Sequence, residues 1–289
     1  MLPTERLDFS AIAHRPKLAL PDGARLAVWV IVNVEEWDPA QPMPRTVLTP
    51  PAGGAAMPDI PNWAWHEYGN RVGFWRMLEA IDEHRIRAVL AVNGSAIGRY
   101  EPIARAALER GWEFIGHGFT QKSMQKVADE RDDIRKTAAA IRDFTGRNPR
   151  GWLGPGLTET WETPDLLVEE GYEYVCDWVL DDEPVLLGTR TKPIVGVPYT
   201  QECNDVAMML IQHHKAEEYY DRATSSSSST ATRQARPESW RWWCIPISWA
   251  RRTASDTSAP RSPISAPIGT CCSGPARRSS TGTGHSAHN

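Results

Sequence analysis

Apolar runs alternate with amphipathic segments along the first 220 or so residues. The run "RLAVWVIVNVEEWD" (25–38) is almost continuously apolar until it ends in acids, which is typical of a strand buried on both faces of a parallel sheet. Residues 71–85 then repeat apolar side chains at helical spacing, and a second apolar run follows at 86–97. This order of strand, helix and strand builds parallel sheets and barrels.

The same alternation continues to about residue 223. We expect further helices at 101–111, 124–146, 163–171 and from 213 on, and further strands at 112–118, 149–156, 172–184 and 192–200. Six strands with helices between them predict an α/β fold, namely a distorted, incomplete TIM-like (β/α)7 barrel. The aromatic-rich stretch "NWAWHEYG" (62–69) is expected to be a loop that walls a pocket or packs over the barrel end.

The composition changes abruptly near residue 224. Of the 66 residues at 224–289, 45 are Ser, Thr, Ala, Arg or Pro, and none is Leu, Val, Met, Phe or Tyr. Such a segment cannot bury enough apolar surface to offset its chain entropy, so we expect disorder there. Residues 1–223 are therefore predicted to be the barrel domain and residues 224–289 an aberrant tail.

This tail also holds four of the chain's tryptophans and three of its five cysteines, which is unusual for a disordered segment. Tryptophan and cysteine beside Arg, Pro and Ser are what a GC-rich gene yields when it is read out of frame. Shifting "WWCIPISWA" (242–250) by one base admits "VVHPYIMG", and "ATSSSSST" (223–230) admits "DQFVVVY". We therefore interpret the tail as a frameshift that begins near Ala223 or Thr224 and conceals a seventh strand.

The charge distribution and the number of cysteines indicate which binding partners and which cellular compartment to expect. The net charge of −4 divides into −10 before residue 224 and +6 after it, but a basic tail of this composition does not indicate a nucleic-acid site. The longest apolar run, "LAVWVIV", is too short to cross a bilayer, and the N-terminus lacks the pattern of a signal peptide. Five cysteines, an odd number without metal-type spacing, argue against a disulfide framework and fit a reducing compartment. We therefore expect a cytoplasmic protein without membrane or nucleic-acid partners.

Residues that can do chemistry follow the expected strands. In α/β barrels the active site lies at the carboxyl ends of the strands. That rule selects Glu35, Glu36, Asn93, His117, Trp152, Asp177, Trp178 and Tyr199.

This order of residues resembles the polysaccharide deacetylase superfamily over about residues 20–222. The resemblance implies hydrolysis of N-acyl and related C–N bonds, with Glu35 as general base and Glu36 as metal ligand. It implies that His117 in "GHGFTQKS" (116–123) is a second ligand, but Gln121 stands where the family has another histidine. It also implies that Asp177 orients a late catalytic histidine, which this chain encodes only in the other frame.

The substrate and the metal stay open at this stage. The stretches "EYGNRVGFWR" (67–76) and "VPYTQECND" (197–205) look most like the allantoinase-type branch, which implies a cyclic amide substrate. A metal-dependent carbohydrate N-deacetylase and a catalytically dead remnant are the alternatives. A divalent ion such as zinc on Glu36, His117 and Gln121 and metal-independent chemistry are equally open. We expect a small-molecule or saccharide amide as substrate, bound by Asn93, Trp152, Trp178 and Tyr199, and a homo-oligomer in intact relatives.

Each of these residues also has a structural interpretation. Adjacent strand residues face opposite ways, so Glu35 and Glu36 share the barrel interior only if the strand has already ended. Asp177 beside a buried strand can be half of an ion pair. Trp152 and Trp178 are more often core residues than substrate contacts.

Overall fold

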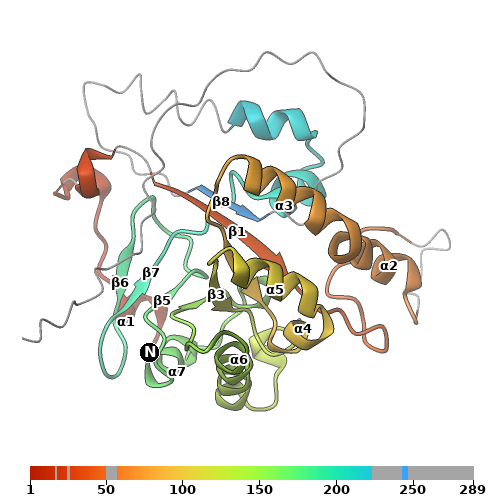
Figure 1. Ribbon diagram of the computed structural model, residues 1–289. Helices are drawn as coiled ribbons and strands as arrows, with labels where there is room; N and C mark the ends of the chain where they lie inside the picture. Colours follow the sequence, from red (N-terminus) through yellow and green to blue (C-terminus); the bar gives the residue numbers. More distant parts are fainter. Residues whose placement is uncertain (17, 25–26, 50–56, 223–242, 247–289) are drawn as a thin grey trace, which may run out of the picture.

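The computed structural model describes residues 1–16, 18–24, 27–49, 57–222 and 243–246 (Figure 1). Its single sheet contains, in chain order, β1 Val28–Val34, β2 Val89–Val92, β3 Glu113–Gly116, β4 Gly151–Trp152, β5 Tyr174–Val175, β6 Val185–Leu187, β7 Ile194–Gly196 and β8 Trp243–Pro246. The strands lie in the order β6-β7-β5-β4-β3-β2-β1-β8. Neighbours are parallel except β6 and β7, which are antiparallel.

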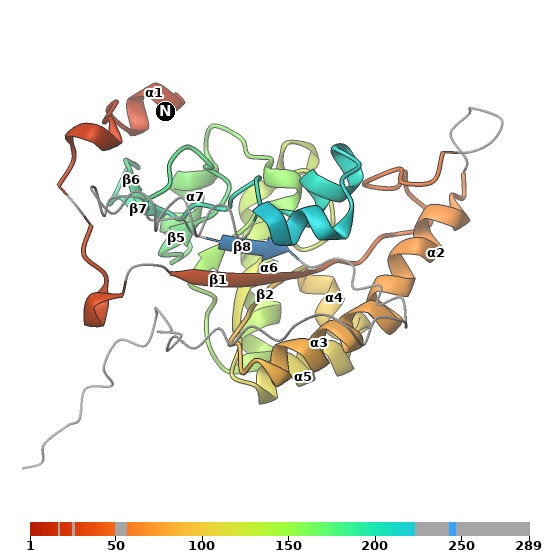
Figure 2. The ribbon, with the colours of Figure 1, turned by 90° about the horizontal axis from the view of Figure 1, so that it is seen from above.

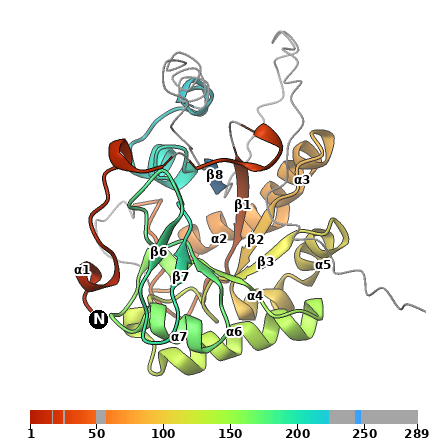
Figure 3. The ribbon, with the colours of Figure 1, turned by 90° about the vertical axis from the view of Figure 1, so that its left-hand side faces the viewer.

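Helices connect the strands and follow the outer side of the curved sheet (Figure 3). The α-helices are α1 Pro3–Arg6, α2 Ile60–Tyr68, α3 Phe74–Glu83, α4 Gly94–Arg99, α5 Glu101–Glu109, α6 Glu130–Thr145 and α7 Thr163–Glu169. Two π-helical segments lie at Gly69–Gly73 and Val206–Ile211, short 3-10 turns lie at Ile12–His14, Pro21–Gly23, Met124–Lys126 and Pro155–Leu157, and residues 216–222 are helical. The architecture is the α/β, TIM-like open barrel that the sequence predicts.

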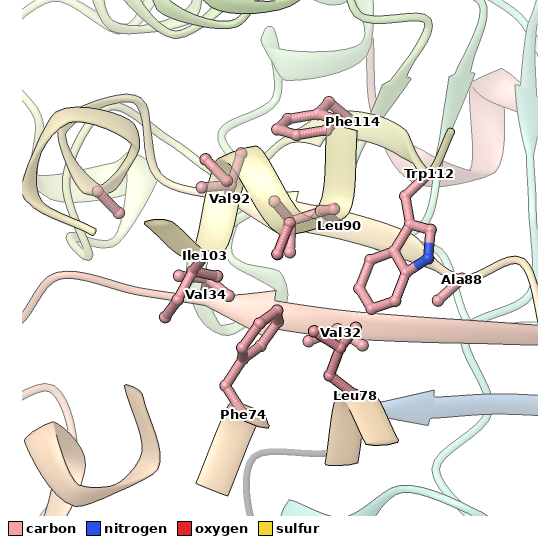
Figure 4. Packing of buried hydrophobic residues seen from close by; sticks show 14 of the residues in the cluster. Val32, Val34, Phe74, Leu78, Ala88, Leu90, Val92, Ile103, Trp112 and Phe114 are labelled. Atoms are coloured by element: carbon pink, nitrogen blue, oxygen red, sulfur yellow. The ribbon is translucent and has the colours of Figure 1, made fainter. Parts of the chain in front are cut away.

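Both faces of the central strands are buried, which explains their continuous apolar runs. Val32 and Val34 of β1 pack with Leu90 of β2 against Phe74 and its neighbours on the helical side (Figure 4). The alternate residues, such as Ile31 and Val89, belong to a second cluster on the inner side. Because successive strand residues point to opposite faces, a two-sided sheet needs apolar residues at every position.

Two expectations about local structure are wrong. The stretch 62–69 is helical rather than a loop, because Asp59 caps α2 by accepting the Asn62 N–H at 3.2 Å and Pro61 lies in the first turn. The stretch 172–184 is not one strand, since β5 has only two residues and is followed by irregular chain. The separate strand β6 then forms the antiparallel edge against β7.

Four residues of the C-terminal tail lie in the sheet. Residues 243–246 form β8, whose backbone pairs in parallel with β1 from Val28 opposite Trp243 to Ile31 opposite Pro246 (Figure 2). The expected disorder therefore does not apply to these four residues, and for the rest of 224–289 that expectation lies outside the described residues. No helix in the part of the chain that the structure describes is long and apolar enough to span a membrane.

Candidate active site

A cavity of about 980 Å³ lies where the chain leaves the carboxyl ends of β1 and β3. Its lining includes the polar side chains of Glu35, Glu36, His66, His117, Gln121 and Tyr199. β1 ends at Val34, before the two glutamates, so the alternation of the strand no longer separates them. Both glutamates therefore line the cavity.

Glu35 and His117 face each other in this cavity. The Glu35 Oε1 atom lies 3.3 Å from His117 Nε2, and Glu35 Oε2 accepts the indole N–H of Trp37 at 2.7 Å. Burial raises the pKa of the Glu35 carboxyl, whereas the hydrogen bond and charge of His117 lower it, with smaller contributions from His66 and Trp37. The lowering effects together exceed the effect of burial, so the pKa lies below its usual value. Glu35 is thus a carboxylate at neutral pH.

A hydrogen bond on the side away from Glu35 fixes the orientation of the His117 ring. Its Nδ1–H donates to the main-chain carbonyl of Leu153, which follows β4, and this bond leaves Nε2 facing Glu35. The glycines on either side of His117 have different roles. Gly118 permits an unusual backbone angle, with φ +72°, whereas Gly116 provides space, because a Cβ there would lie 2.7 Å from the Trp152 ring.

Asn93 joins the ends of the first three strands. This fully buried side chain accepts the Glu36 N–H at 3.0 Å through Oδ1, and its amide donates to the His117 carbonyl and, at 3.1 Å, to Gln121 Oε1. Asn93 does not line the cavity, so the structure places it behind the site rather than against substrate. It positions the residues that do line it.

The described residues do not fit the expected metal site. Glu35 and His117 supply two adjacent donors, but within the described ranges no group of three His, Cys, Asp or Glu side chains is placed to hold a metal ion. Gln121 uses its amide oxygen to accept a hydrogen bond from Asn93. Zinc sites normally use at least three protein ligands, so the described residues supply too few donors for zinc.

The expected substrate contacts divide into two groups. Tyr199 lines the cavity, and its hydroxyl accepts a hydrogen bond from the Asn33 amide at 3.2 Å. Trp152 has no exposed surface and packs edge-on against Tyr172, with ring centroids 5.5 Å apart. Trp178 packs against the same apolar cluster and donates its indole N–H to Glu159 at 2.8 Å. Neither tryptophan lines the cavity, so the core interpretation applies to both.

Asp177 lies behind the cavity and faces another acid instead of an arginine. One of its oxygens accepts the Gly154 N–H at 2.7 Å. Its other oxygen and Glu159 Oε1 are buried and receive no hydrogen bond from a described residue. Burial and mutual repulsion raise the pKa of Asp177 well above its usual value, and burial raises that of Glu159 to about 7. One shared proton would satisfy both oxygens.

The structure adds His66, which the sequence analysis did not single out. It belongs to α2, and its imidazole stacks on Trp37 with ring centroids 4.4 Å apart. One turn later, the Asn70 amide donates to the Glu35 carbonyl at 3.3 Å, which ties this helical segment to the end of β1. The sequence could have indicated His66, because Asn62, His66 and Asn70 are spaced at i, i+4 and i+8 and so lie on one polar face of a helix.

Sequence comparison relates part of this chain to a known family. Residues 65–175 match the polysaccharide deacetylase family. This chain matches that family over less than half of its length. It is 26% identical over 218 residues to a putative polysaccharide deacetylase of Schizosaccharomyces pombe, covering 64% of this chain and 66% of that protein. It is 24% identical over 109 residues to a peptidoglycan deacetylase of Helicobacter pylori, covering 37% of each. The matches thus span less than two thirds of these relatives.

Solved structures show the same fold for the deacetylase domain. An allantoinase superposes with a TM-score of 0.66 at 23% identity, covering 81% of this chain and 80% of the allantoinase. A probable polysaccharide deacetylase from Pseudomonas aeruginosa superposes with a TM-score of 0.64 at 24% identity, with the same coverage. At these identities the likeness concerns the fold, and the chemistry has to be argued from the site.

Proposed function

We propose that this chain hydrolyses a carbon–nitrogen bond other than a peptide bond, in a small cytosolic amide or cyclic amide. The pairing of Glu35 with His117 in the cavity carries this proposal. Amide hydrolysis needs a base for water, stabilisation of the tetrahedral oxyanion and a proton for the departing nitrogen. The match to the deacetylase family and the fold shared with an allantoinase support the same reaction class.

The residues present can supply the first two requirements. The Glu35 carboxylate removes a proton from water, whose oxygen adds to the amide carbon. His117, with Nδ1–H on the Leu153 carbonyl, presents Nε2 to the cavity and, when protonated, stabilises the oxyanion by donating a hydrogen bond. We propose that substrate also contacts Glu36, Gln121 and Tyr199, which line the same cavity.

The late histidine that the family resemblance implies is absent from this reading frame. The acid expected to orient it, Asp177, faces Glu159 instead. We propose that the frame shifts near Thr224, and two observations support this: the composition changes there, and the backbone of 243–246 lies beside β1, where a closing strand belongs. The chain as written should therefore be slower than its frame-restored counterpart.

The experiment compares the two chains. The gene is resequenced across the codons for Arg222 to Ser226, and both proteins are assayed on cyclic amides and on N-acetylated sugars. We expect a missing or extra base, and at least about 100-fold faster turnover by the restored chain, the usual contribution of one proton-transferring residue. An intact frame, or equal rates from both chains, would contradict the frameshift proposal. Inactivity of both on every amide would overturn the proposed function.

A metal-dependent carbohydrate N-deacetylase is the second candidate, favoured by the similarity to the Helicobacter pylori peptidoglycan deacetylase. Chelation separates the two. Because the described residues offer too few donors for a zinc site, we expect EDTA followed by gel filtration to leave the activity unchanged. Loss of activity on chelation, with recovery on adding zinc and a preference for N-acetylated sugars, would favour this candidate.

Glu35 provides the direct test of the site. Glu35→Gln keeps the size and the hydrogen bond from Trp37 but removes the base, so kcat/KM should fall by about 100- to 10,000-fold. The matched control is Glu79→Gln on the exposed side of α3, which should retain full activity. A Glu35→Gln protein with unchanged kcat/KM would show that the base lies elsewhere.

A further inference from the structure

His66 is the second histidine of the cavity, and its ring is held by contacts on α2 and the β1 end. Its imidazole lies nearly parallel to Trp37, with an interplanar angle of 16°. The same indole donates to Glu35, so Trp37 joins His66 to the Glu35 and His117 pair. A stacked ring of this kind is fixed in direction without using either of its nitrogens.

Neither nitrogen of His66 has a hydrogen-bond partner among the described residues. Nδ1 is buried and unpaired, which is rare for a buried polar atom and calls for an explanation. Nε2 also makes no hydrogen bond, but it is not enclosed as Nδ1 is, and the residue lines the cavity. A purely structural histidine would normally use at least one nitrogen, so this arrangement points to a ligand or a reacting group.

The charges around His66 fit proton transfer. Burial lowers the pKa of its imidazole, and Glu35 at the end of β1 and Glu67 on its own helix raise it, with a net value below the usual one. The free imidazole is therefore neutral at pH 7 and can accept a proton.

We propose that, in the chain as written, which lacks the late histidine, His66 is a further catalytic residue that delivers the proton to the departing nitrogen. This inference rests on the proposed hydrolysis. Water gives one proton to Glu35 as its oxygen bonds to the amide carbon. That proton passes through the cavity water to His66 Nε2 and from there to the nitrogen as the C–N bond breaks. The products are a carboxylic acid and an amine, and Glu35 and His66 return to their starting forms.

The test compares two leaving groups. His66→Gln is assayed in the full chain on an alkyl amide, whose nitrogen needs a proton, and on the p-nitrophenyl ester of the same acid, whose phenolate leaves without one. We expect kcat on the amide to fall by about 100-fold or more and kcat on the ester to fall less than about threefold. The matched control is His84→Gln, at the exposed end of α3, which should change neither rate.

A second variant separates chemistry from structure. His66→Ala should lose amide hydrolysis in the same way and recover part of it when free imidazole is added, because the cavity can admit the base. Equal losses on amide and ester, or no loss on either, would overturn the role of His66 while the wild-type activity still supports the proposed function. A wild-type chain that cleaves neither substrate would overturn both.

Discussion

The two halves of the sheet are held together in different ways. β1 and β2 pair over four residues, and β2 and β3 over another four. Beyond them the ladders shorten, since β3 and β4 share one pair, and β4 with β5 and β5 with β7 share two each. The first half therefore has long backbone ladders between two apolar layers, whereas the second half needs other support.

Ion pairs provide much of that support. Arg6, near the N-terminus, is 3% exposed and reaches Asp165 of α7 at 2.6 Å, while also donating to the Trp161 and Gly188 carbonyls at 2.6 and 2.8 Å. The main-chain N–H of Arg190 donates to the other oxygen of Asp165 at 2.6 Å. The N-terminal segment thus fastens α7 to the chain beyond β6. Polar side chains can therefore replace strand pairing where the ladder is short.

The largest effect is expected from breaking this contact. Arg6→Met leaves Asp165 buried beside apolar surface with only one of its two partners, which costs about 3–5 kcal/mol of unfolding free energy. Urea denaturation measures the loss, and hydrogen exchange should rise around α7 and β6 before it rises in β1 to β3.

A matched arginine on the surface gives the control. Arg105 pairs with Glu101 one helical turn away on α5, and both side chains are more than half exposed. Arg105→Met should change the unfolding free energy far less, since exposed pairs contribute little. Similar losses from the two variants would show that the buried Arg6–Asp165 pair gives the second half no special support.

The first half should respond instead to loss of apolar volume. Leu90 is fully buried in β2, so Leu90→Ala should cost about 3 kcal/mol through lost transfer free energy and the cavity left behind. Leu186 of β6 is 65% exposed, and Leu186→Ala should cost much less. Thermal or urea unfolding of the Leu90→Ala and Leu186→Ala variants measures both losses. The loss of unfolding free energy in Leu90→Ala should be independent of the salt concentration. A loss below about 1 kcal/mol at Leu90 would show that the ladders alone hold this half.

The same contrast explains what the sequence could predict. The apolar runs that contain β1, β2 and β3 are readable because both faces of those strands are buried, and His117 follows the third run directly. Gly146 was equally readable as the end of α6, where it adopts φ +75°. In these places local pattern and tertiary structure agree.

Elsewhere tertiary contacts decide. No local sequence pattern predicts that the Trp152 side chain is buried in the core, because its position depends on contact with Tyr172, which precedes the next strand. The pairing of Asp177 with Glu159 joins residues from two loops that no periodicity relates. His66 was hidden because the helix signal at Asp59 and Pro61 was outweighed by the aromatic composition of the stretch. Sites built from loops after short strands are therefore the least predictable part of this fold.

The smallest and sharpest test concerns the buried acid pair of the second half. Asp177 and Glu159 have raised pKa values in the folded state, the latter about 7 against an ordinary value of 4.5. Between these values the folded protein binds more protons than the unfolded chain, so its stability is highest at low pH and falls as the pH rises. The slope from one such group is at most about 1.4 kcal/mol per pH unit.

Asp177→Asn should reduce that slope without disturbing the packing. The asparagine oxygen can still accept the Gly154 N–H, and its amide can donate to Glu159 without a shared proton. Unfolding free energies measured by urea between pH 4.5 and 7.5 should therefore decline in the wild type and stay flatter in the variant, which becomes the more stable protein by about 1–2 kcal/mol at pH 7.5. Parallel pH profiles for the two proteins would mean that the pair is ionised and solvated, and that this half of the barrel opens to water behind the site.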